Sequence, residues 1–374
     1  MSKDVPVKFG FQVAPVSPDL PDHLSYREAV DDCIFGQDLG YHGAWFLEHH
    51  FTDYYPTPSP LLFMAHVARA CPKLSLGTSV LVLPWYHPVR IAEEILMLDA
   101  FTDAELHLGI GRGTAKLEYD AYGVDMSEAR TRFEEAFKII RMALRGESFA
   151  FKGRHFAIPR EIVARPRPYS DKIHFYGAIG SPASAGIMGE LGVAPFCLSQ
   201  FPDHLLTRIL NQWHTKYTAQ GGAEGAILPL SIKMMLADTE ERAQELGRQY
   251  LPHYFELQAN HYEVDANHWA GVSGYEVFAK MLGNMRQLAN PDNLGPYMAT
   301  NLVGTPETVT RRLEELTRLG FNYFLVSAAY PGVPKEIRRD QYRRFAEEVA
   351  PHFAGCTARF TPSAGGAEPQ RATG

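Results

Sequence analysis

The chain has 374 residues, 45% of them hydrophobic, with a formal net charge of −7 and an isoelectric point near 6.1. The acidic balance argues against a nucleic-acid partner, no apolar run reaches the roughly 18 residues of a membrane-spanning helix, and the N-terminus lacks the apolar stretch of a signal peptide. Four widely spaced cysteines without a paired motif are typical of a reduced protein, so we expect a cytoplasmic protein that binds neither nucleic acid nor membranes.

Short β-rich segments alternate with helical patterns along the first half of the chain. Pro88 precedes an apolar stretch, and proline is favoured in the first turn of a helix. The clearest helical period is that of Phe133, Phe137, Ile140 and Leu144, which recur at i, i+4, i+7 and i+11. The predicted strands are 7–13, 43–47, 74–83 and 106–110, with helices at 25–39, 60–70 and 89–101.

The same alternation continues in the second half and gives eight predicted strands in all. Strands that alternate with helices favour a parallel sheet with right-handed crossovers, here an α/β fold closed as a (β/α)8 TIM barrel. An open, doubly wound sheet is the alternative, but no Gly-x-Gly-x-x-Gly follows the first strand. The later strands are 173–178, 193–198, 228–236 and 322–327, with helices at 183–191, 204–220, 239–250, 306–319 and 335–350.

Two segments interrupt this rhythm. Residues 258–275 are rich in aromatic residues and long for a loop, which fits either a lid over a site or a plain surface excursion. Residues 357–374 are small and rich in proline and glycine, which predicts a disordered tail. We therefore expect one barrel domain with insertions over residues 1–356.

An acid and two histidines, Glu48, His49 and His50, follow the second predicted strand, where a barrel gathers its functional groups. A metal is disfavoured, because no His-x-x-x-His or cysteine pair supplies further ligands. Successive side chains of a strand point to opposite sides, so only one of the two histidines can face the barrel mouth. By residue type alone, a structural histidine is the commoner outcome.

An anion site is indicated near the fourth and fifth predicted strands. The segment "GSPASAG" places Gly180 in a turn and Ser181 at a helix start, where backbone N–H groups attract an anion. The Ser184 hydroxyl adds a donor. Arg112 lies in a glycine-flanked turn, and Arg130 lies in the first turn of a helix, where a cation opposes the helix dipole. Together these groups favour a phosphate monoester.

Six stretches, taken in chain order, resemble one known family. They span about residues 7 to 350 and read "WFLEHHF", "GTSVLVLPWYHPVRIAEEILMLDAFT", "LGIGRG", "YGVDMSEAR", "GSPAS" and "LVGTPETV". The chain resembles the bacterial luciferase-like flavin-dependent monooxygenases in all six. The resemblance implies a homodimeric barrel that binds reduced FMN delivered by a separate NAD(P)H:flavin reductase. It further implies that O₂ gives a C4a-peroxyflavin, which oxygenates an apolar organic substrate by aldehyde oxidation or Baeyer–Villiger insertion.

The resemblance also assigns residue roles. His49 matches the family's acid/base histidine, and a group that titrates near neutrality suits that work, with Glu48 and His50 as supports. Ser79 and Val80 match the family's non-proline cis peptide beneath the flavin ring. The positions matched to the FMN phosphate site are Arg112, Arg130, Ser181 and Ser184. Gly180, in the turn before Ser181, is also expected to bind the cofactor, although the luciferase α subunit has a glutamate at this position.

The sequence departs from the family at several positions, and two alternative functions stay open. Thr102–Asp103–Ala104–Glu105 stands where the family often has Ser-x-Gly-Arg, which reverses a charge, and Gly111 replaces a luciferase cysteine, which argues for a non-luminescent relative. The alternatives are an F420-dependent hydride-transfer enzyme on the same barrel and a flavin-binding protein without turnover. The Glu-His-His stretch favours the oxygenase over the first alternative, and His49 together with the candidate lid at 258–275 argues against the second.

Overall fold

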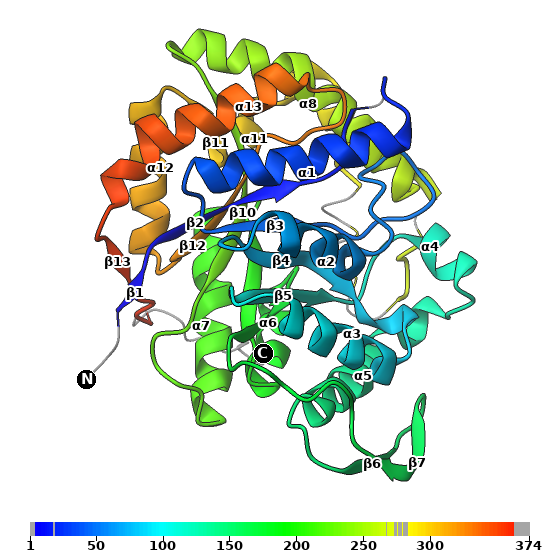
Figure 1. Ribbon diagram of the computed structural model, residues 1–374. Coiled ribbons are helices and arrows are strands. Elements are labelled where there is room, and N and C mark those ends of the chain that lie inside the picture. The colour runs from blue at the N-terminus through cyan, green and yellow to red at the C-terminus, as the bar shows by residue number, and fades with distance from the viewer. Residues whose placement is uncertain are drawn as a thin grey trace, which may run out of the picture.

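Eight parallel strands close into a barrel in the computed structural model, which describes residues 4–17, 19–266, 268–272, 275, 279 and 283–362 (Figure 1). Each strand pairs with the next, and the last pairs with the first, which closes the ring. The predicted TIM barrel is confirmed. Its strands are β2 (Lys8–Val13), β3 (Gly43–Phe46), β4 (Ser75–Val82), β5 (Leu106–Gly111), β8 (Ile173–Ala178), β9 (Ala194–Leu198), β10 (Pro229–Leu236) and β12 (Tyr323–Ser327).

These segments form strands because the barrel buries both of their faces. Every residue of β3, β5 and β12 is buried, as expected for parallel strands covered by helices. Side chains on one face fill the barrel interior, while the others pack against the surrounding helices. The interior cluster consists of Trp45, Tyr176, Phe196, Tyr323 and Leu325.

Helices surround the barrel, and they agree with the predicted helical segments to within a few residues. Phe133, Phe137 and Ile140 are buried on one face of their helix, as their spacing predicts. The helix 239–250 was predicted too short. The main helices are α1 (Asp22–Asp38), α2 (Pro60–Ala70), α3 (Pro88–Phe101), α5 (Ala129–Ala143), α6 (Pro182–Glu190), α7 (Asp203–Ala219), α8 (Glu240–His261), α12 (Pro306–Arg318) and α13 (Lys335–Arg344); shorter ones are α4 (Lys116–Ala121), α10 (Met285–Leu288) and α11 (Gly295–Thr300).

Several small elements decorate the barrel. An antiparallel hairpin, β6 (Phe149–Lys152) with β7 (Ala157–Ile162), projects at the lower edge of Figure 1. Strand β11 (Leu302–Gly304) pairs with the end of β10. The predicted tail begins with order rather than disorder, because β13 (Thr357–Ala358) pairs with β1 (Val5–Pro6). Residues 363–374 of that tail lie outside the described residues.

The candidate lid, residues 258–275, is only partly a loop. Helix α8 continues to His261, so the first four residues of this segment are helical. Two aromatic side chains of the segment are buried against the loop that follows β5: the Trp269 indole donates to the Thr114 carbonyl at 2.9 Å, and the Tyr275 hydroxyl donates to the Gly113 carbonyl at 2.8 Å. The described part of the segment therefore packs over the carboxyl end of β5.

Strands β4 and β5 approach each other unusually closely at their carboxyl ends. The Ser79–Val80 peptide bond is cis, as the resemblance implies, and the strand register shifts at this point. A Cβ atom on Gly109 would lie 2.3 Å from the Thr78 carbonyl oxygen, and one on Gly111 would lie 2.6 Å from a Val80 methyl group. Glycine is therefore required at position 109, where a backbone oxygen blocks the Cβ atom, and at position 111 only while the Val80 side chain occupies that space.

All four cysteines are free thiols. Cys33, Cys71 and Cys197 are buried, whereas Cys356 is exposed. Burial raises the pKa of the Cys33 thiol well above its ordinary value. Among the described residues, no helix has both the length and the apolarity to cross a membrane.

Candidate active site

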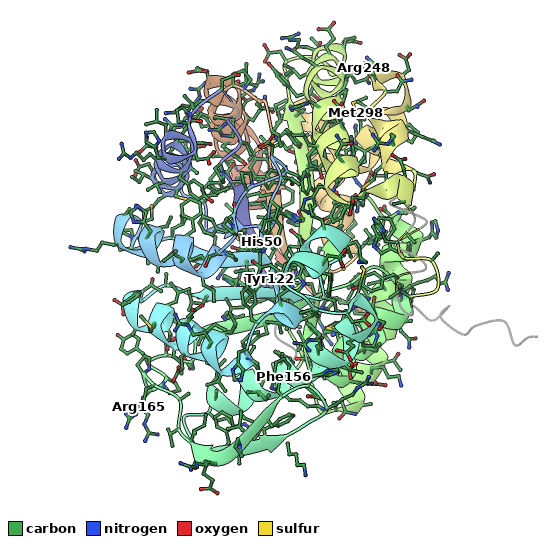
Figure 2. The ribbon with its side chains drawn as sticks, turned by 90° about the vertical axis from the view of Figure 1, so that its right-hand side faces the viewer. His50, Tyr122, Phe156, Arg165, Arg248 and Met298 are labelled. Atoms are coloured by element: carbon green, nitrogen blue, oxygen red, sulfur yellow. The ribbon has the colours of Figure 1, made fainter. Side chains whose placement is uncertain are left out.

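A cavity of about 260 Å³ opens at the carboxyl ends of the barrel strands. This end of the barrel faces the viewer in Figure 2. The sequence-predicted residues do not all reach the cavity. His50 is buried behind the wall, and Arg130 is half-buried on α5 without lining the cavity. The predicted residues that line it are Glu48, His49, Ser79, Val80, Arg112, Gly180, Ser181 and Ser184.

The two adjacent histidines point to different sides, as alternation along an extended chain predicts. His49 borders the cavity, whereas the His50 ring packs away from it, with Nδ1 at 3.0 Å from the Tyr122 hydroxyl (Figure 2). Glu48 shares the side of His50, and its Oε1 lies 3.3 Å from His50 Nε2. Glu48 also accepts hydrogen bonds from the Val82 N–H at 2.7 Å and the Tyr86 hydroxyl at 2.5 Å. Glu48 and His50 therefore anchor the loop that presents His49.

A buried carboxylate links His49 to a second histidine. His49 Nδ1 lies 3.7 Å from Glu118 Oε1, and His261 Nε2 lies 3.4 Å from the same oxygen. Burial lowers the pKa of His49 to about 4, although the nearby Glu118 carboxylate opposes the shift. Burial alone would raise the pKa of Glu118, but the two imidazoles bring it down to about 2. At neutral pH the site therefore holds a neutral imidazole beside a carboxylate anion.

The anion-binding side of the cavity is built on the start of α6. Ser181 caps this helix: its hydroxyl accepts from the Ser184 N–H at 3.2 Å, and the Ser184 hydroxyl accepts from the Ser181 N–H at 3.0 Å. The Gly180 N–H also donates to the Ser184 hydroxyl, at 3.2 Å. The helix-start geometry predicted from the sequence is confirmed, and it brings the positive end of the helix dipole to the cavity wall.

Two arginines lie beside the same end of the cavity. The Arg112 guanidinium stacks over the Tyr275 ring, with 4.4 Å between its Cζ atom and the ring centroid. Burial raises the pKa of Tyr275, while the charges of Arg112 and Arg130 lower it, which places both cations within electrostatic range of this ring. Arg130 therefore contributes positive charge from outside the cavity wall.

A lysine inside the barrel was missed by the sequence analysis. Lys233 of β10 lines the cavity, and its Nζ atom lies 4.8 Å from the centre of the Tyr254 ring and 5.3 Å from that of Tyr330. Burial lowers its pKa to about 7. A lone lysine in the apolar strand "LPLSIKMML" was the available signal, because lysine is rarely buried without a reason.

Aromatic side chains form part of the remaining wall, but not every aromatic residue near His49 in the sequence reaches the cavity. Tyr54 and Tyr55 line it, whereas the Phe51 side chain is 60% exposed to solvent. Trp85 stacks on Tyr122 behind the His50 ring, outside the cavity. Further wall residues come from the later part of the chain. Gln258, Tyr262 and Tyr275 belong to the candidate lid, residues 258–275, whereas the sequence analysis missed Tyr254, Met285 and Tyr297.

Comparison with known proteins agrees with this geometry. A family model described as luciferase-like monooxygenase matches residues 8–323. Limonene 1,2-monooxygenase from Rhodococcus erythropolis is 26% identical, covering 85% of this chain and 79% of that protein. The oxygenase component of flavin-dependent trigonelline monooxygenase from Acinetobacter baylyi is 24% identical, covering 91% of this chain and 93% of that protein.

Solved structures share the fold. A monooxygenase from Streptomyces bottropensis has a TM-score of 0.77 at 22% identity, covering 92% of this chain and 99% of its own. The FMN complex of the oxygenating constituent of 3,6-diketocamphane monooxygenase from Pseudomonas putida has a TM-score of 0.71 at 19% identity, covering 94% and 99%. An F420-dependent secondary alcohol dehydrogenase has a TM-score of 0.70 at 16% identity, covering 92% and 98%. At these identities the likeness shows the barrel and leaves the cofactor open.

Proposed function

Because the chain belongs to the luciferase-like monooxygenase family, a family of flavin-dependent enzymes, we propose that it is the oxygenase of a two-component system. It would take reduced FMN from a separate NAD(P)H:flavin reductase and use O₂ to oxygenate an apolar organic substrate. The observation that carries the proposal is one cavity with a helix-start anion site at one side and the neutral imidazole of His49 at another.

The residues of the cavity fit a flavin mononucleotide. Ser181, Ser184 and the first turn of α6 would hold the phosphate, with Arg112 adding charge-assisted bonds. The buried Ser79 hydroxyl has no hydrogen-bond partner among the described residues and lines the cavity beside Val80. Ser79 and Val80, near the end of β4, would lie beneath the ring system. Bound reduced flavin supplies the two electrons with which O₂ can oxygenate a substrate.

His49 would hold or move a proton beside the reacting atoms. Its imidazole is neutral down to about pH 4, so at neutral pH it can donate a proton from one nitrogen and accept one at the other. The Glu118 carboxylate, 3.7 Å from Nδ1, stabilises the protonated imidazole whenever one forms. Tyr54 and Tyr262 pack around the ring and help to exclude water from it.

The substrate would lie against the aromatic wall. Tyr54, Tyr254 and Tyr297 offer apolar ring faces, which suit an aldehyde or a ketone with a hydrocarbon body. Lys233 is the cation on this wall and would bind the carbonyl oxygen. Both aldehyde oxidation and Baeyer–Villiger insertion fit these contacts.

A reductase partner is supported by the name of the trigonelline relative, an oxygenase component. A cytoplasmic location and a homodimer complete the proposal, and the homodimer rests on family analogy. The described part of 258–275, which packs over the carboxyl end of β5, would serve as a lid on the cavity.

A reconstituted assay tests the proposal directly. The protein would receive photoreduced FMN, O₂ and either a long-chain aldehyde or a cyclic ketone, and the oxygenated product would be measured against released hydrogen peroxide. We expect His49→Ala to lower product formation about 100-fold, the usual size of an acid/base contribution, with little change in FMN affinity. His42→Ala, at the other end of the barrel, is the matched control. Unchanged product formation in His49→Ala would make His49 a structural residue.

Flavin selection separates the alternatives. Titration with reduced FMN, oxidised FMN and F420 should show the tightest binding for reduced FMN. Tight binding of F420 with weak binding of FMN would favour a hydride-transfer enzyme, which the fold of an F420-dependent neighbour also accommodates. Flavin binding without any substrate oxygenation would favour a flavin-binding protein without turnover.

A further inference from the structure

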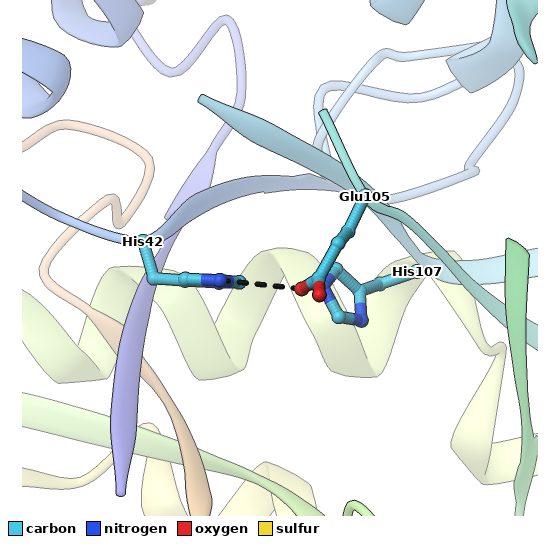
Figure 3. A group of neighbouring side chains, drawn as sticks. All are labelled: His42, Glu105 and His107. Carbon is cyan, nitrogen blue, oxygen red and sulfur yellow. Dashed lines mark ion pairs between the residues drawn. The ribbon is translucent and has the colours of Figure 1, made fainter. Parts of the chain in front are cut away.

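A second group of ligand-type side chains lies at the amino ends of the strands, opposite the cavity. His42 precedes β3, Glu105 precedes β5, and His107 is the second residue of β5 (Figure 3). None of the three lines the cavity. The side chains of His42 and Glu105 are 24% and 31% exposed, so this group, unlike the core beneath it, opens to solvent.

The three side chains converge on one point. His42 Nε2 and His107 Nε2 each lie 3.3 Å from the same oxygen, Glu105 Oε2, and the three ligand atoms all lie within 4.8 Å of one another. His107 is fully buried, and among the described residues its Nε2 atom has no hydrogen-bond partner. A buried ring nitrogen that faces a carboxylate without a hydrogen bond is costly unless another group satisfies it.

The opposite nitrogens of both rings are already held. His42 Nδ1 lies 3.1 Å from the Tyr323 hydroxyl, and His107 Nδ1 lies 2.9 Å from the Tyr176 hydroxyl. Metal-binding histidines are commonly oriented in this way, by a hydrogen bond on the nitrogen that does not bind the metal. The arrangement fixes both Nε2 atoms toward Glu105.

We propose that His42, Glu105 and His107 bind a divalent transition-metal cation of the zinc class, with water as the fourth ligand. Two histidines and one carboxylate form an established zinc ligand set. Tetrahedral bonds of about 2.0–2.1 Å place neighbouring ligand atoms roughly 3.3–3.4 Å apart. The two nitrogen–oxygen distances of 3.3 Å match this spacing.

Lys8 competes with the cation. Its Nζ atom lies 3.2 Å from Glu105 Oε2, but its side chain is 30% exposed and sits at the start of β2, so it can turn into solvent. The bound cation would join the chain before β3 to β5 and stabilise the amino end of the barrel, far from the proposed chemistry. The proposal therefore does not depend on the monooxygenase activity.

Calorimetric titration tests the site on the full-length protein after treatment with a chelator, with Zn²⁺ and Co²⁺ as probes. We expect one cation per chain in the wild type, at least about 100-fold weaker binding in Glu105→Gln and in His42→Ala, and tighter binding in Lys8→Ala. A tetrahedral Co²⁺ absorption spectrum should appear in the wild type and disappear in Glu105→Gln. Unfolding midpoints measured with and without Zn²⁺ should rise only in variants that keep the site.

Glu118→Gln is the matched control, because His49, Glu118 and His261 also place ligand-type atoms within 4.8 Å of one another. This variant should bind Zn²⁺ as the wild type does. If no cation binds to the wild type or to Lys8→Ala, or if Glu105→Gln binds as tightly as the wild type, the proposal is wrong. Loss of binding in Glu118→Gln alone would show that the cation binds in the cavity, and this result would also overturn the proposal.

Discussion

Two groups with the same composition, one glutamate between two histidines, lie at opposite ends of this barrel. They differ in the surroundings of the carboxylate: the Glu118 side chain is 2% exposed and accepts a backbone N–H, whereas the Glu105 side chain is 31% exposed and pairs with a lysine. The group at the carboxyl ends of the strands borders the cavity and consists of His49, Glu118 and His261. The group at the amino ends opens to solvent and consists of His42, Glu105 and His107.

This difference shows why residue type alone does not assign a role. Burial keeps the imidazole of His49 neutral near pH 7. The Glu118 carboxylate, already bonded to a backbone N–H, stabilises that imidazole when it takes up a proton, which suits proton transfer at a bound ligand. A carboxylate near the surface, paired with a partly exposed ammonium group, can exchange that partner for another cation. Position along the strands therefore separates the two proposed roles, since the carboxyl ends of barrel strands carry chemistry and the amino ends carry stability.

The largest expected effect is a decrease in the free energy of unfolding at acidic pH, to which one histidine of each group contributes. Burial lowers the pKa of His49 and of His107 to about 4, against 6.5 in the unfolded chain. As the pH falls from 6.5 to 4, the unfolded chain takes up these protons before the folded protein does, so the free energy of unfolding decreases. The loss is at most about 3 kcal/mol for each histidine.

Denaturant unfolding at pH 7, 5.5 and 4.5, without added metal, measures this loss. His49→Gln removes one of these groups and should reduce the pH dependence, while His107 keeps its share and His174 and His214, whose pKa values burial also lowers, add to the remainder. Equal unfolding free energies at pH 7 and 4.5 in the wild type would show that the two imidazoles are not buried in the way the structure has them.

The next largest effect separates the two glutamates. Glu118→Gln removes the charge beside His49 while keeping the side-chain volume, and we expect product formation to fall on the order of 10-fold to 100-fold. Glu105→Gln should change it less than about 2-fold, because this residue is remote from the reacting atoms. Steady-state product formation with reduced FMN, together with FMN affinity, measures both. A comparable loss in the two variants would remove the functional distinction between the ends of the barrel.

The smallest expected effect concerns Lys233 in the cavity, with Lys8 at the amino end of the barrel as its control. Burial lowers the pKa of Lys233 to about 7, so its charge changes near neutrality and should produce a limb near pH 7 in the profile of product formation. Lys233→Met should remove this limb and lower the rate about 10-fold, roughly the value of one hydrogen bond to a charged group. Lys8→Met is the control and should keep the limb. A limb that persists in Lys233→Met belongs to another group.

The barrel was predictable from the sequence because its strands are short, nearly continuous runs of buried residues. All eight predicted strands exist, with shifts of one or two residues at their ends. The β6–β7 hairpin was missed because its strands are mostly exposed and leave a weak pattern. The tail was judged by composition, which cannot show that Thr357 and Ala358 find a partner in β1, more than 300 positions earlier.

The cavity residues that lie close to the ends of strands were predictable from the sequence, whereas those that come from helices were not. His49, Arg112 and Ser181 each lie within three residues of the end of a strand, and all three line the cavity. Glu118 and His261 come from a short helix and the end of a long one, so their meeting with His49 depends on tertiary packing. The catalytic and cofactor-binding roles assigned by resemblance remain predictions.

The close approach of β4 and β5 has an evolutionary consequence. A Cβ on Gly111 would collide with a methyl group of Val80, a side chain, whereas a Cβ on Gly109 would collide with the backbone oxygen of residue 78. Relatives with a larger residue at position 111 should therefore carry a smaller or differently shaped one at position 80, so the two positions should covary. Position 109 has no such compensating exchange and should stay glycine while its neighbours diverge.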